Sequence, residues 1–80
     1  MLTFNNKKYN FLTVVKHRNR KKVAIDEFNT NNFNEGIKKS EKIFTELAPI
    51  IVNEKRTLET YVIKDEKLYT IVNNQLNLVI

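Results

Sequence analysis

With 80 residues and no cysteine, the chain is long enough for one domain (residues 1–80) and excludes disulfide frameworks, thiolate nucleophiles and cysteine-ligated metal sites. It has no apolar run of the roughly 20 residues that span a bilayer and no signal-peptide pattern, so we expect a cytoplasmic protein with no membrane partner. The formal net charge of +5 favours an anionic partner, although small soluble domains commonly carry such a charge.

Strands are predicted first along the chain. Residues 2–4 and 9–16 form the first two, joined by a turn at Asn5-Asn6, and apolar and polar side chains alternate with a period of two through most of the second. Residues 23–25 form a return strand after a polar tip at residues 17–20, and the polar residues 26–32 are expected to form a loop. This part of the sequence therefore predicts a three-stranded meander whose last turn is basic.

A helix is predicted next. Asn32 can cap its start, and Glu35 three residues later completes a capping-box pattern. Pro49 cannot donate a backbone hydrogen bond, so we expect the helix to end near Leu47, with residues 50–52 forming either a short strand or a helix tail. The face expected to cover the sheet carries Ile37, Ser40, Ile43, Phe44, Leu47 and Ala48.

Three more strands are predicted at residues 58–63, 68–72 and 76–80, separated by turn-forming residues at 64–67 and at Asn73-Asn74. The expected fold class is α+β. The expected order is βββ-α-βββ, a single antiparallel sheet of about six strands with one helix packed on one face.

The strongest candidate site is the basic run between the second and third predicted strands. At a hairpin tip such side chains can contact phosphates, and the two arginines can bind them through two parallel hydrogen bonds. A solvated turn whose charge prevents association between sheet edges explains the run equally well. The candidate nucleic-acid or partner-binding residues are Lys16, His17, Arg18, Arg20, Lys21 and Lys22.

Other chemistry is less well supported. Tyr9, Phe11, Tyr61 and Tyr69 could stack on bases, but core packing is the commoner role of strand aromatics. The only histidine has no second histidine as an acid–base partner, and no zinc or calcium spacing occurs. We therefore predict no catalytic residue, metal or cofactor.

The leading hypothesis is a small non-enzymatic binding protein that docks through the basic hairpin on nucleic acid or a nucleoprotein complex. Abundant Asn, Lys and Ile reflect AT-rich codons, which suits a phage or mobile-element protein. By analogy with anti-CRISPR and anti-restriction proteins, it would inhibit a host defence complex. One alternative is a small ribonuclease toxin centred on His17, with Arg18 and Arg20. The other is a protein–protein adaptor or homodimer that uses the C-terminal strand.

Overall fold

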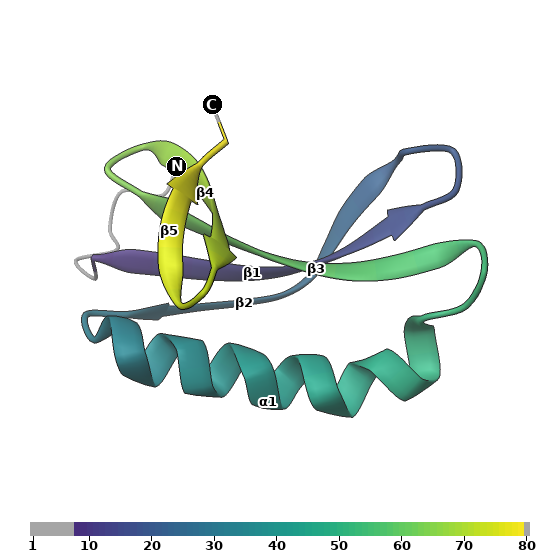
Figure 1. Cartoon of the computed structure of the whole chain (residues 1–80), viewed down its shortest axis with the longest axis horizontal. Helices are drawn as coiled ribbons and strands as arrows, with labels where there is room; N and C mark the ends of the chain where they lie inside the picture. The colour runs from purple at the N-terminus through teal and green to yellow at the C-terminus, as the bar shows by residue number, and fades with distance from the viewer. Residues whose placement is uncertain (1–7, 80) are drawn as a thin grey trace.

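The computed structural model describes residues 8–79, which form a five-stranded antiparallel sheet with one helix along one face (Figure 1). The expected α+β fold is confirmed, while the strand expected at residues 2–4 and its turn at Asn5-Asn6 lie outside the described residues. The elements are β1 (Tyr9–His17), β2 (Lys22–Thr30), α1 (Phe33–Ile51), β3 (Arg56–Lys64), β4 (Lys67–Val72) and β5 (Gln75–Leu78).

The strands follow the spatial order β2-β1-β3-β4-β5, so β1 lies between β2 and β3 and pairs antiparallel with both. The predicted N-terminal meander is therefore wrong in its pairing, because β3 occupies the second side of β1. Because both neighbours oppose β1, they run parallel to each other, and α1 connects them by crossing over β1. The register of β1 against β2 shifts after Thr13, where Ile25 is an extra residue in β2. This bulge adds local twist next to the hairpin tip.

Two tight turns join the last three strands, as the sequence predicts. Asp65-Glu66 and Asn73-Asn74 all have positive φ, between 51° and 66°. Two consecutive residues in this region form the hairpin turn whose twist matches that of the flanking strands. The C-terminal strand is paired, as expected, and forms the edge of the sheet beside β4.

The start of α1 follows the sequence, but its end does not. The Asn32 side chain accepts a hydrogen bond from the Glu35 backbone N–H at 3.0 Å, as predicted. The capping box is not completed, because the Asn32 backbone N–H donates to the Thr30 hydroxyl and not to the Glu35 side chain. The prediction that the helix ends near Leu47 is wrong, because the helix continues through Pro49 to Ile51. A proline so close to the end removes a single hydrogen bond, and the Val52 N–H still bonds to the Ala48 carbonyl at 2.9 Å.

The core lies between α1 and the middle strands. Phe11, Ile37 and Val62 form its buried centre, and the Phe28 ring stacks on Phe11 with centroids 5.1 Å apart. The helix passes over Phe11 at Gly36, where an added Cβ would overlap the aromatic ring. Glycine thus sets how closely α1 approaches β1. No helix in the described part of the chain is long and apolar enough to cross a membrane.

Candidate nucleic-acid interface

The basic run forms the tip of the β1–β2 hairpin, as predicted, and extends beyond the body of the sheet (Figure 1). The His17 N–H donates to the Lys21 carbonyl and the Arg20 N–H donates to the His17 carbonyl, both at 2.8 Å. These bonds define a three-residue loop, Arg18 to Arg20, in which Arg20 adopts a left-handed conformation with φ of 70°. Glycine or asparagine usually occupies such a position, so an arginine there is a local strain.

The predicted site residues do not all face the same way. Arg18, Arg20 and Lys21 are exposed at the tip, whereas Lys16 and His17 are half-buried at the end of β1. Lys22 is also exposed, but it follows the tip as the first residue of β2, and its ammonium contacts Tyr61 and Glu59 of β3. The structure therefore places three exposed cations at the tip, whereas the ammonium of Lys22 is engaged with β3.

Lys22 takes part in a short hydrogen-bond network with β3. Its ammonium donates to the Tyr61 hydroxyl at 2.6 Å and lies 3.5 Å from the Glu59 carboxylate, while the Tyr61 hydroxyl donates to Glu59 at 2.6 Å. The hydrogen bond from Lys22 to Tyr61 is the main cause that raises the pKa of Lys22. The hydrogen bond that the Tyr61 hydroxyl donates to Glu59 is the main cause that lowers the pKa of Glu59. Within residues 8–79 this is the only ion pair.

The α1–β3 connection supplies cations that sequence reasoning missed. His17 at the end of β1 pairs in register with Arg56 at the start of β3, and Lys55 precedes it on the connecting turn. The hairpin and the α1–β3 connection border a shallow hollow on the surface. It is lined by His17, Arg18, Asn19, Asn53, Lys55 and Arg56. The sequence signal was Lys55-Arg56 directly before a predicted strand, but only the pairing register places it beside the hairpin.

The chemistry of this hollow is that of an anion site. Its lining contains two arginines, a lysine, a histidine and two amides, and it contains no carboxylate. Guanidinium groups bind phosphate oxygens through parallel hydrogen bonds, and amides can donate to the same oxygens. The lining holds one imidazole, that of His17, and no second imidazole or carboxylate beside it.

The cations of the helix lie in a different electrostatic setting. Lys38, Lys39 and Lys42 line a separate surface with Glu35 and Glu46. The Lys39 ammonium sits 4.5 Å from the centroid of the Phe28 ring. Carboxylates are interleaved with these lysines, so this face lacks the unbalanced positive charge of the hairpin end.

The strand aromatics are mainly structural. Phe11 and Tyr61 are buried, and Tyr9 and Tyr69 pack against the core. The Tyr9 ring lies 5.4 Å from that of Phe33, between centroids. Among the described residues these side chains pack within the protein and present no exposed pair on which bases could stack.

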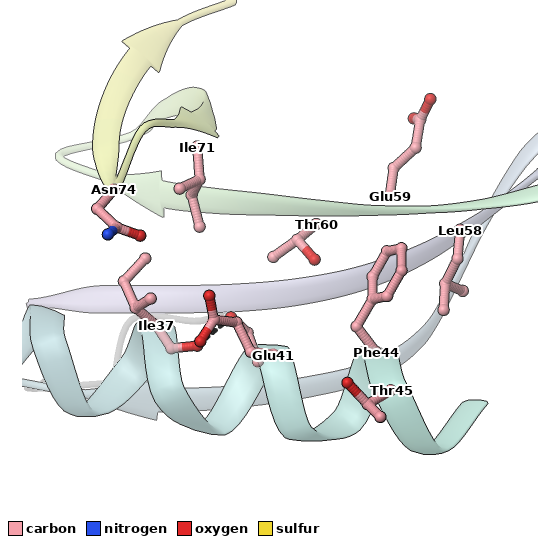
Figure 2. A pocket seen from close by; sticks show the side chains of 10 residues that line it. Ile37, Glu41, Phe44, Thr45, Leu58, Glu59, Thr60, Ile71 and Asn74 are labelled. Atoms are coloured by element: carbon pink, nitrogen blue, oxygen red, sulfur yellow. Dashed lines mark hydrogen bonds between the residues drawn. The ribbon is translucent and has the colours of Figure 1, made fainter. Parts of the chain in front are cut away.

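A second hollow lies between α1 and strands β3 and β4 (Figure 2). Ile37 and Phe44 point from the helix towards the sheet, and Thr60 points towards the helix, whereas the Glu59 side chain points away from it. Ser40 at its floor donates to the Ile37 carbonyl at 3.0 Å. Apolar and polar side chains alternate along this groove, and no group of three or more metal-ligating side chains occurs in residues 8–79.

Comparison with known proteins adds no functional evidence, because no protein-family model, curated protein or solved structure matches the chain.

Proposed function

We propose that the protein binds nucleic acid through its cationic end, which we define as Arg18, Arg20, Lys21, Lys55 and Arg56. The observation that carries the proposal is the carboxylate-free hollow between the hairpin and the start of β3. Two chain segments, separated by the whole helix, contribute cations to it. A polyanion that displays regularly spaced phosphates is the partner class that such a surface fits.

Neutralised phosphates release counterions, so the affinity must fall with salt. If three of the cations contact phosphates, the affinity for duplex DNA should fall about 40-fold between roughly 50 and 200 mM salt. The measurement is fluorescence anisotropy with labelled duplex DNA and labelled RNA at both salt concentrations. An affinity that does not change with salt would contradict the proposal.

A double substitution tests the location of the interface. Arg18→Ala with Arg56→Ala removes one cation from each side of the hollow, and it should lower the salt slope by about two contacts. The matched control is Lys38→Ala with Lys42→Ala, which removes the same charge from the exposed face of α1. Equal losses of affinity in the two variants would show that only net charge matters and would overturn the assignment.

Analysis of RNA products distinguishes the ribonuclease hypothesis from binding without cleavage. RNA incubated with the protein should stay intact, because the hollow offers His17 without a second acid–base group. Cleavage that the wild type performs and His17→Ala loses would favour the enzyme instead.

The narrower hypothesis of a mobile-element inhibitor of host defence rests on composition and analogy. Its test is the capture of a nucleoprotein complex by the wild type but not by the Arg18→Ala, Arg56→Ala variant.

A further inference from the structure

We propose that two copies of this chain associate through the outer edge of β5, the last strand of the described sheet, which lies at the opposite side of that sheet from the cationic end. This inference is independent of nucleic-acid binding. It rests on the hydrogen-bond alternation of β5, on the self-complementarity of its residues and on the distribution of charge.

The outward backbone groups of β5 have no partner strand among residues 8–79. Asn73-Asn74 form a two-residue turn, so Gln75 and then every second residue bond to β4, and the Val79 N–H accordingly donates to the Leu68 carbonyl at 2.8 Å. The N–H and C=O groups of Leu76 and Leu78 therefore point outward. In the described sheet, β5 has β4 as its only neighbour.

The order of side chains along β5 suits pairing with itself. If Asn77 of each copy lies at a two-fold axis, Leu76 of one copy lies opposite Leu78 of the other, and these two residues exchange both backbone bonds. Leu76 and Leu78 share the sheet face on which Ile71 and Tyr69 pack against the core. Leu78 is 57% exposed in the single chain, and this register would cover it with Leu76 of the second copy.

The two edge strands of the described sheet differ in how well they are protected against pairing with another chain. The outer strand β2 carries Lys22, Asp26 and Glu27 and is bulged at Ile25, features that prevent strand pairing. Residues Gln75–Leu78 contain no charge and no proline. The β1–β2 hairpin, which carries Arg18, Arg20 and Lys21, lies at the other end of the molecule from β5 (Figure 1), so a β5 contact keeps these cations of two copies far apart.

The experiment is sedimentation equilibrium over a concentration series up to several hundred micromolar, at roughly 50 and 500 mM salt. We expect a dimer that is as strong or stronger at high salt, because screening reduces repulsion between cationic chains. Nucleic-acid binding weakens with salt, so each proposal can fail without the other. A chain that stays monomeric at both salt concentrations would overturn the dimer. Hydrogen exchange identifies one such case: if the Leu76 and Leu78 amides of a monomer are protected, another segment of the same chain covers β5.

Charge substitutions at the axis test the register. Asn77→Lys should weaken dimerisation about tenfold or more, because two ammonium groups then oppose each other, and Asn77→Glu should do the same. A mixture of the two variants should regain the association as a heterodimer. Asn29→Lys, which changes an exposed asparagine of β2, is the matched control and should leave the dimer intact. Loss of the dimer in Asn29→Lys but not in Asn77→Lys would overturn the assignment to β5.

Discussion

Arg20 is the residue at which folding and binding make different demands. Its left-handed backbone with φ of 70° suits glycine or asparagine, yet this position holds a cation at the exposed tip of the hairpin. Glu66, with φ of 66°, occupies the same region in a turn between β3 and β4. The two positions provide a direct comparison between a strained residue in the candidate site and one outside it.

Arg20→Gly should therefore raise the free energy of unfolding by up to about 1 kcal/mol, because glycine adopts positive φ without the Cβ penalty. The same substitution removes a cation, so the affinity for nucleic acid should fall and its salt slope should decrease by about one contact. Chemical denaturation and anisotropy measure the two effects.

The control, Glu66→Gly, should give a similar gain in stability without weakening binding, since it removes a negative charge far from the hollow. Lower stability in Arg20→Gly would contradict the account of strain at the hairpin tip.

Tyr61 influences how the stability of the protein depends on acidic pH. A carboxyl whose pKa is lowered on folding contributes stability that is present above its unfolded pKa and is lost as pH falls through the folded pKa. The Tyr61 hydroxyl lowers the pKa of Glu59, and Lys22 adds to that effect. Protonation of Glu59 should therefore contribute to acid destabilisation.

Tyr61→Phe removes both hydrogen bonds of the hydroxyl and should cost about 1 kcal/mol of unfolding free energy at neutral pH. The difference from wild type should shrink as the solution is acidified below the pKa of Glu59, which itself should rise in the variant. Carboxyl titration by NMR and denaturation across acidic pH measure these effects. Tyr69→Phe is the control, since no hydrogen bond to its hydroxyl occurs among residues 8–79. A constant difference across the pH range would contradict the linkage.

At the scale of elements, local sequence signals were sufficient for most boundaries. Period-two alternation located most strands, the Asn32 cap located the helix start, and asparagine and acidic residues marked the turns. The loop expected at residues 26–32 is wrong, because β2 runs from Lys22 to Thr30. As a largely exposed edge strand it carries polar side chains that read as a loop in the sequence. Pro49 misled the prediction of the helix end, because a proline near the C-terminus of a helix removes one bond without ending it. Nothing in the local sequence could show that β1 becomes the neighbour of β3.

The contact of α1 with β1 depends on the single glycine of the chain. Gly36→Ala would place a methyl group against the Phe11 ring, and the resulting shift of the helix should cost about 2 kcal/mol of unfolding free energy even though alanine is the better helix former. Thermal denaturation measures the loss. Ser40→Ala, one turn further along the buried face, is the control and should have a smaller effect. An increase in stability in Gly36→Ala would show that the helix can move away at no cost.

At the scale of the whole molecule, the two candidate binding surfaces lie at opposite ends. The cations of the hairpin and of the α1–β3 connection lie at one end, and the uncharged edge of β5 lies at the other (Figure 1). The hairpin half of the candidate site could be predicted, because six of seven consecutive residues are basic or histidine. Its other half could not, since Lys55 and Arg56 are ordinary surface residues until the β1–β3 register places them beside His17.

The position of β1 in the sheet also determines when the fold can form during synthesis. In a nascent chain that ends after α1, β1 can pair with β2 on one side only. The partner of its other side, Arg56–Lys64, has not yet been synthesised. Closing that ladder joins residues that are 39 to 53 positions apart in sequence, and such non-local contacts form slowly in folding. We therefore expect cooperative folding on the ribosome only after β3 has left the exit tunnel, so that until then the hairpin and helix remain exposed to proteases and chaperones.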